Sequence, residues 1–275
     1  MRGERKLNEE FVMLKEIQQS ELKILIYFRD FCEVNGLKYF ITAGTLLGAV
    51  RHGGFIPWDD DIDVVMPRED YDRFIKHMRR NGAGEFVFQD GKTDNSYPIY
   101  CPKLREKNYV VHEELFGKAL KYNGCYIDIL PLDDCPEDKQ SAQTFFDINV
   151  FLTTALVKKI NPDYRIGYTK KSMKKLHGVA RLLPRSAIRL LRDLLRRNVS
   201  GELLCTVDGA HGYPNEVYER EWFSDSIPME FEGEIFSAPI GWDKLLKNMY
   251  GDYMTPPAKE KTEGHFITIE RAKEQ

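Results

Sequence analysis

Cysteine is scarce in this sequence, which holds five of them among 275 residues. They are an odd number and are scattered along the chain without a C-x-x-C pair. The sequence therefore argues against a disulfide framework and against a structural zinc site. Long apolar runs are missing too, since none approaches the roughly 18 to 20 residues that span a bilayer. A signal peptide and a lipidation motif are also not visible. We therefore expect a cytoplasmic protein.

Strand and helix signals alternate over the first 135 residues. Apolar residues recur at helical spacing over 7–35, 46–51 and 68–80. Short runs of strand-forming residues are bounded by Gly or Pro over 37–42, 62–66, 86–88, 109–111 and 126–130. We expect Pro131 to stop the last of these strands. This alternation predicts an α/β or an α+β core.

The pattern changes beyond Pro136. Helices are expected over 141–160 and over 172–197, with a break near Pro184. From Trp222 onward we expect loops around one helix at 242–250. We therefore divide the chain into a catalytic core, 1–135, and a second part, 136–275, which is mostly helical and basic in its middle and completes the active site. The two parts are expected to form one compact unit.

The acidic run WDDDID at 58–63 is the main candidate for a catalytic site. Side chains two apart on a strand point to the same face, so Asp61 and Asp63 form a pair. Such a pair can hold one or two Mg²⁺ ions, which prefer oxygen ligands. By the same alternation Asp60 faces away, while Asp59 falls on the metal side. The alternative is a solvated acidic loop.

Two other features support the catalytic interpretation. Gly44-Thr45 stands between a strand and a short helix, where backbone N–H groups can approach a phosphate. The alternative is an ordinary turn and helix cap. Asp128 stands within an apolar strand, where an unpaired carboxylate would be costly. Its partner is either a metal ion shared with Asp61 and Asp63 or a nearby Lys or Arg.

Together these residues resemble the signature of the nucleotidyltransferase fold, which consists of a Gly-Ser/Thr turn, a strand with paired carboxylates and a third strand carboxylate. The resemblance implies an α+β fold with a mixed sheet flanked by helices. The gap between Gly44 and Asp61 is longer than usual in that fold because of the insertion at 51–58. This departure points to one branch, since residues 39–63 resemble the defining motif of the LicD family. The resemblance continues through 66–71, 127–133, 231–233 and 250–257.

The LicD family transfers phosphocholine from CDP-choline to sugars of teichoic acids or lipopolysaccharide, and its fukutin-type relatives transfer ribitol phosphate from its CDP form. The resemblance implies a CDP-alcohol donor, a glycan or lipid-linked oligosaccharide acceptor, and CMP as the leaving group. Asp61 and Asp63 would hold Mg²⁺, or alternatively Mn²⁺. Asp128 would be either a shared metal ligand or the base that takes the acceptor proton.

Further residues are candidates for substrate binding. Arg51 suits the diphosphate, or else an ion pair with Asp59 or Asp60. His52 is expected to have a structural hydrogen-bonding role beside the site, and Lys103 to contact phosphate or to lie solvated on the surface. Aromatic residues could bind a quaternary ammonium group through cation–π contact, or could belong to the core. These are Trp58, Tyr71, Tyr126 and Tyr250.

The segment 158–197 contains thirteen Lys or Arg against two Asp, a local charge of +11 in a chain of net charge −3. A basic amphipathic stretch can lie on an anionic membrane surface, so we expect peripheral contact at the inner face of the membrane. The alternative is a helical subdomain with a solvated basic face. Nucleic acid is not expected as a partner, because no aromatic platform accompanies the charge.

Two other functions compete with phospho-alcohol transfer. A nucleotidyltransferase would use a nucleoside triphosphate and release pyrophosphate. A non-catalytic scaffold that binds glycans would not need the carboxylates, so the presence of Asp61, Asp63 and Asp128 argues against it.

Overall fold

The computed structural model describes residues 2–113, 115–116, 120–164, 180, 182–256 and 268–271. Its helices are α1 (Arg2–Asn35), α2 (Ala43–His52), α3 (Arg68–Asn81), α4 (Lys139–Lys158), α6 (Arg185–Arg197), the short 3-10 helix η1 (Arg220–Phe223) and α7 (Trp242–Tyr250). Its strands are β1 (Phe40–Ile41), β2 (Ile62–Pro67), β3 (Val87–Gln89), β4 (Lys103–Arg105), β5 (Tyr109–His112), β6 (Tyr126–Cys135), β7 (Leu203–Cys205), β8 (Val217–Glu219), β9 (Ser226–Phe231), β10 (Glu234–Pro239) and β11 (Thr268–Arg271).

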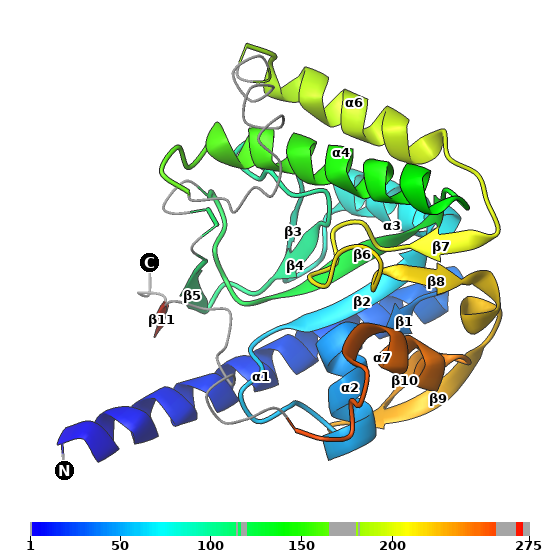
Figure 1. Cartoon of the computed structure of the whole chain (residues 1–275). Helices are drawn as coiled ribbons and strands as arrows, with labels where there is room; N and C mark the ends of the chain where they lie inside the picture. Colours follow the sequence, from blue (N-terminus) through cyan, green and yellow to red (C-terminus); the bar gives the residue numbers. More distant parts are fainter. Residues whose placement is uncertain are drawn as a thin grey trace.

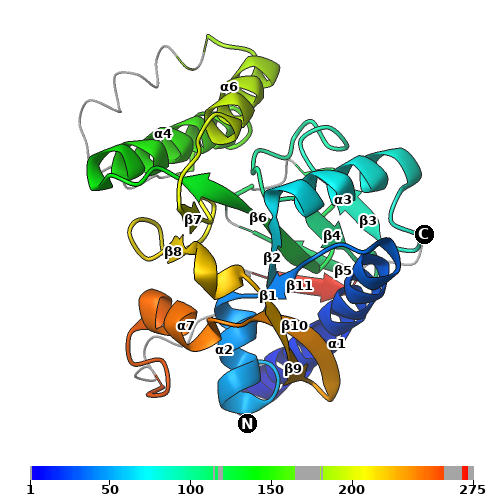
Figure 2. The same ribbon diagram turned by 90° about the vertical axis from the view of Figure 1, so that its right-hand side faces the viewer.

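Within the described residues, a mixed sheet of seven strands organises the fold (Figure 1). Its order is β1-β2-β6-β4-β3, and β7 and β8 extend it beside the second half of β6. Strands β2 and β6 are parallel, and their other neighbours are antiparallel. Helices α4 and α6 lie side by side outside the sheet in both views (Figures 1 and 2). The predicted α+β fold with a mixed sheet flanked by helices is confirmed.

The parallel pair β2 and β6 is the buried centre of the sheet, because both strands consist largely of branched aliphatic residues. Ile62 is opposite Ile127 in the register, and Val64 is opposite Ile129. All four side chains are fully buried. Polar side chains interrupt this pattern at one register position, where the functional site lies.

The prediction that Pro131 ends a strand is wrong, since β6 continues to Cys135. The N–H of Ile129 points toward the β4 edge and bonds to the carbonyl of Pro102 at 3.1 Å. Residue 131 faces the same edge, two positions further on. There, β4 has already ended its pairing at Asp128, and β7 begins its pairing only at Asp133. The missing N–H of proline therefore costs no ladder hydrogen bond.

The expectation of loops between Trp222 and the last predicted helix is also wrong. Strands β9 and β10 form a regular antiparallel hairpin with Phe231 opposite Glu234. Pro228 in β9 and Pro239 in β10 interrupt the strand pattern in the sequence. They are tolerated because this hairpin is a separate two-stranded sheet, in which both strands are edges.

The helix that follows the first strand begins earlier than predicted, at Ala43 instead of residue 46. The N–H of Leu46 already bonds to the carbonyl of Thr42 at 3.0 Å. Gly44 and Thr45 are therefore in the first turn of α2, and the preceding strand is only two residues long.

The predicted helix over 172–197 falls partly on 172–179 and 181, which lie outside the described residues. In the described part, α6 begins directly after Pro184, at the predicted break. No helix in the described ranges has the length and apolar character needed to cross a bilayer.

Candidate active site

Carboxylates from neighbouring strands meet at the centre of the sheet. Asp63 on β2 is opposite Asp128 on β6, and Asp61 precedes β2 by one residue. One oxygen of each of these three side chains lies within 4.8 Å of the other two. All three are partly exposed. The set fits a Mg²⁺ ion, because such ions prefer oxygen ligands and keep several waters.

The other two carboxylates of the acidic run lie in different surroundings. Asp60 is buried, whereas Asp59 faces the same pocket as Asp61 and Asp63. A Cβ atom at Gly44 would stand 2.8 Å from Asp59 Oδ2. Glycine therefore lets the Asp59 carboxylate approach the first turn of α2, where free N–H groups favour negative charge.

The side chain of Thr45 connects α2 to strand β2. Its hydroxyl accepts a hydrogen bond from the backbone N–H of Asp63 at 2.8 Å, and the side chain is buried. The N–H of Thr42 bonds to the carbonyl of Asp63 at 3.2 Å. The start of α2 therefore holds the backbone of Asp63 at both its N–H and its carbonyl group.

Lys103 is buried, with 4% of its surface exposed, so the alternative of a solvated surface residue is wrong. Its Nζ lies 3.2 Å from Asp128 Oδ2 and 3.2 Å from Glu113 Oε2. Burial raises the pKa of Asp128, and the Lys103 ammonium group opposes this rise. Burial also favours a higher pKa for Glu113, but Lys103 and Arg105 outweigh it and lower that pKa below its ordinary value.

The predicted basic partner of Asp128 is confirmed, since Asp128 forms an ion pair with a lysine. Its carboxylate also lies close enough to Asp61 and Asp63 for the three to hold one ion, so a shared metal stays a prediction. Lys103 reduces the repulsion that three carboxylates would otherwise exert on one another.

These groups open into a pocket of about 700 Å³. Among the predicted aromatic residues, Trp58, Tyr126 and Tyr250 line it and Tyr71 does not. The Tyr71 hydroxyl instead donates to the carbonyl of Tyr100 at 3.2 Å within the core. The ring of Tyr126 is covered by Lys103 Nζ, 3.0 Å from its centroid. Burial, together with Asp63 and Asp59, raises the pKa of Tyr250.

Arg51 lines the pocket, whereas His52 is exposed and is not among the lining residues. The Nε of Arg51 donates to His52 Nε2 at 3.0 Å, and its Nη1 donates to the carbonyl of Tyr253 at 3.0 Å. Burial and the neighbouring Arg51 lower the pKa of His52. His52 therefore does not line the pocket itself, but it accepts a hydrogen bond from Arg51, which does.

Sequence reasoning missed several lining residues that come from loops. Asp208, His211 and Glu216 belong to the connection between β7 and β8, and Glu113 follows β5. Buried Glu216 accepts hydrogen bonds from the Thr206 and Tyr218 hydroxyls. No periodic pattern marks such positions, because loop residues are placed by tertiary contacts.

The arginines of the basic segment are used differently from our expectation where the structure describes them. On α6, Arg192 and Arg196 are buried against the protein. Apolar side chains of the same helix are exposed, with 58% for Leu190, 47% for Leu191 and 48% for Leu194. The predicted basic face is therefore only partly present on α6, since Arg192 and Arg196 face the protein while Arg197 is exposed beside the leucines. Contact of this segment with a membrane stays a prediction.

Sequence comparison identifies a known family domain within this chain. The sequence model described as "LicD/FKTN/FKRP, nucleotidyltransferase domain" matches residues 36–151, which include β1, α2, β2, β6 and the first part of α4. The chain carries a LicD-family domain. The carboxylates of β2 and β6 and the turn at Gly44 all lie within this LicD-family domain.

Similarity to one relative extends over nearly the whole chain. The lipopolysaccharide cholinephosphotransferase LicD of Haemophilus influenzae is 28% identical over 92% of this chain and 96% of that protein. The human ribitol 5-phosphate transferase FKRP is 41% identical over 65 residues, which are 24% of this chain and 13% of that protein. An uncharacterized protein of Rickettsia prowazekii is 61% identical over 38% of this chain and 35% of its own length. The Haemophilus and human relatives are both named as transferases of a phosphorylated alcohol, phosphocholine in one and ribitol 5-phosphate in the other.

Proposed function

We propose that this protein transfers phosphocholine from CDP-choline to a sugar hydroxyl of a cell-surface glycan precursor, releasing CMP. The observation that carries the proposal is the convergence of Asp61, Asp63 and Asp128 in one pocket of a LicD-family domain. The sugar part of lipopolysaccharide is supported as an acceptor by the activity for which the Haemophilus relative is named, and teichoic acid is the other acceptor that we propose.

Asp61, Asp63 and Asp128 would hold Mg²⁺, or Mn²⁺ in its place. When bound, the ion would neutralise the diphosphate and stabilise the leaving CMP. An oxygen of the acceptor forms the new bond to the donor phosphorus, and the bond from that phosphorus to CMP breaks in line with it. The proton of the acceptor hydroxyl goes to a carboxylate, for which Asp128 is the candidate if it is not a metal ligand.

The protein's own side chains would bind and orient the donor. Arg51, held by His52 and Tyr253, is placed to contact a phosphate oxygen. Lys103 would act mainly on Asp128 and Glu113, since both of its close partners are carboxylates. Trp58 and Tyr250 are the lining aromatics that we assign to the quaternary ammonium group, because the Tyr126 ring already faces Lys103.

A panel of donors tests this proposal. CDP-choline, CDP-ethanolamine, CDP-glycerol and CDP-ribitol are each incubated with the protein, Mg²⁺ and a glycan acceptor, and CMP release is measured. We expect CDP-choline to be preferred. Preference for CDP-ribitol would move the substrate toward that of the FKRP relative. Pyrophosphate release from a nucleoside triphosphate, with no CMP from any CDP-alcohol, would establish the nucleotidyltransferase alternative.

A further inference from the structure

Asp128 receives two contacts from one segment of the pocket wall. Cys101 Sγ lies 3.6 Å from Asp128 Oδ1, and Lys103 Nζ lies 3.2 Å from Asp128 Oδ2. Ile99 and Cys101 themselves line the pocket. The position of the segment 95–103 therefore determines where the Asp128 carboxylate points.

Arginine side chains of helix α6 donate hydrogen bonds to the backbone carbonyl groups of this segment. Arg189 Nη2 donates to the carbonyl of Asn95 at 3.0 Å and to that of Tyr97 at 2.9 Å. Arg192 Nη1 donates to the carbonyl of Pro98 at 3.0 Å. Residues 95–98 precede β4 and have no strand partner, so the guanidinium groups supply hydrogen bonds that their carbonyl groups need.

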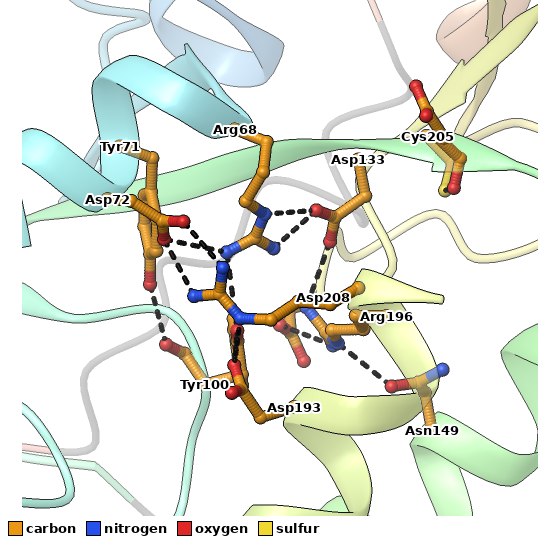
Figure 3. A network of polar contacts seen from close by, with 12 residues as sticks. Arg68, Tyr71, Asp72, Tyr100, Asp133, Asn149, Asp193, Arg196, Cys205 and Asp208 are labelled. Atoms are coloured by element: carbon orange, nitrogen blue, oxygen red, sulfur yellow. Dashed lines mark hydrogen bonds and ion pairs between the residues drawn. The ribbon is translucent and has the colours of Figure 1, made fainter. Parts of the chain in front are cut away.

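The same helix also holds a second part of the wall. Arg196 is one turn further along α6, and its Nη2 lies 2.8 Å from Oδ2 of Asp208, which lines the pocket. Its Nε donates to Asn149 on α4 at 2.9 Å. Figure 3 shows Arg196 between Asp208 and Asn149, with Asp133 and Arg68 on its other side. Arg192 and Arg196 thus reach two different lining segments from one helix.

The burial of the Arg192 guanidinium group costs free energy that a purely structural side chain would not cost. Its side chain is 2% exposed, and burial lowers its pKa to about 10. Among the described residues, it forms no ion pair with a carboxylate, and its Nε has no hydrogen-bond partner. A well-packed apolar side chain of similar volume usually stabilises a fold as well as a buried charge does. Fold stability alone therefore gives little reason for an arginine at this position.

We propose that Arg192 is a positioning residue, which holds the 95–103 segment so that Cys101 and Lys103 keep Asp128 aligned with Asp61 and Asp63. Together with Arg196, it makes α6 a brace for the pocket wall. This role rests on the proposed function, because the alignment of Asp128 with Asp61 and Asp63 matters only if the three carboxylates act together.

The accessibility of cysteines tests the brace without relying on activity. All five cysteines are free and buried, so each reports local opening through its rate of alkylation by iodoacetamide. In full-length Arg192→Met, we expect alkylation of Cys101 to rise about tenfold while Cys32, in the core beside α3, stays protected. Arg192→Lys, which can still donate to the Pro98 carbonyl, should keep Cys101 protected.

The matched control is Arg197→Met, on the same helix. Arg197 bonds to Asp72 and Asp193, and neither of them lines the pocket. It should leave Cys101 protected. The brace is refuted if Cys101 stays protected in Arg192→Met, if Cys32 becomes reactive together with it, or if Arg197→Met has the same effect.

Donor turnover gives a second and separate readout. If the proposed function holds, Arg192→Met should lower kcat for CMP release about tenfold, with Arg192→Lys restoring most of it. An unchanged kcat would overturn the role in catalysis. If wild-type protein releases no CMP from any CDP-alcohol, the proposed function fails, and the cysteine rates still decide whether α6 braces the wall.

Discussion

Replacement of Thr45 by valine separates two roles for this residue. The sequence suggests a phosphate contact, whereas the structure has the Thr45 hydroxyl bonded to the N–H of Asp63 at 2.8 Å. Valine has nearly the same shape, and the side chain is 2% exposed, so the change removes the acceptor and creates no cavity. The N–H of Asp63 then lies buried without this partner. Such a loss costs about 1–3 kcal/mol.

The assay is urea unfolding followed by tryptophan fluorescence, with Thr45→Ser as the matched control that keeps the hydroxyl. We expect Thr45→Val to lower the free energy of unfolding by about 1–3 kcal/mol and Thr45→Ser to lose less. Mn²⁺ affinity should fall in Thr45→Val, because the backbone of Asp63 is no longer fixed. Unchanged stability and metal affinity, combined with a raised KM for the donor, would refute this reasoning and restore the phosphate contact.

Three further predictions follow from the site and its surroundings. Gly44→Ala places a methyl group 2.8 Å from Asp59 Oδ2 and should lower CMP release, whereas Asp30→Asn at the surface should leave it unchanged. The lowered pKa of Glu113 stabilises the fold above the ordinary pKa of about 4.3, and this stabilisation is lost as the pH falls below it. Wild type should therefore exceed Glu113→Gln in urea midpoint at pH 7, with the difference shrinking toward pH 3; a constant difference would contradict the assignment. If the exposed leucines of α6 meet an anionic membrane, wild type should float with anionic liposomes and Leu190→Gln/Leu194→Gln should not, whereas no flotation of wild type at physiological salt would end the membrane hypothesis.

The core of the site follows from local patterns in the sequence. Strand alternation is a local property; it pairs Asp61 with Asp63, which both line the pocket, and it turns Asp60 away, which is buried and does not line it. An oxygen of Asp60 nevertheless lies within 4.8 Å of oxygens of Asp59 and Asp61, so Asp60 is less separate than alternation suggests. The parallel register that brings Asp128 opposite Asp63 requires two strands about 60 residues apart to align, so no local pattern gives it. The resemblance to a known family supplied that step.

Other features depend on tertiary contacts that a sequence does not display. Pro131 reads as a strand end, yet it is accommodated by a gap between the two strands that border β6. The arginines of α6 read as a solvated basic face, yet Arg192 and Arg196 are buried because carbonyl groups and carboxylates of distant segments face them. A helical wheel gives the polar face of α6 but not the side on which the protein lies.

The most direct test of the account is a metal titration of CMP release from CDP-choline by wild type, Asp61→Asn, Asp63→Asn and the surface control Asp30→Asn. Asparagine keeps the size of the side chain and removes the charge that binds the ion. We predict that release by wild type and Asp30→Asn requires Mg²⁺ or Mn²⁺, and that each of the other two variants loses at least about 100-fold in rate. Release that is independent of divalent ions, or that survives both substitutions unchanged, would contradict the assignment of Asp61 and Asp63 as the metal-binding carboxylates.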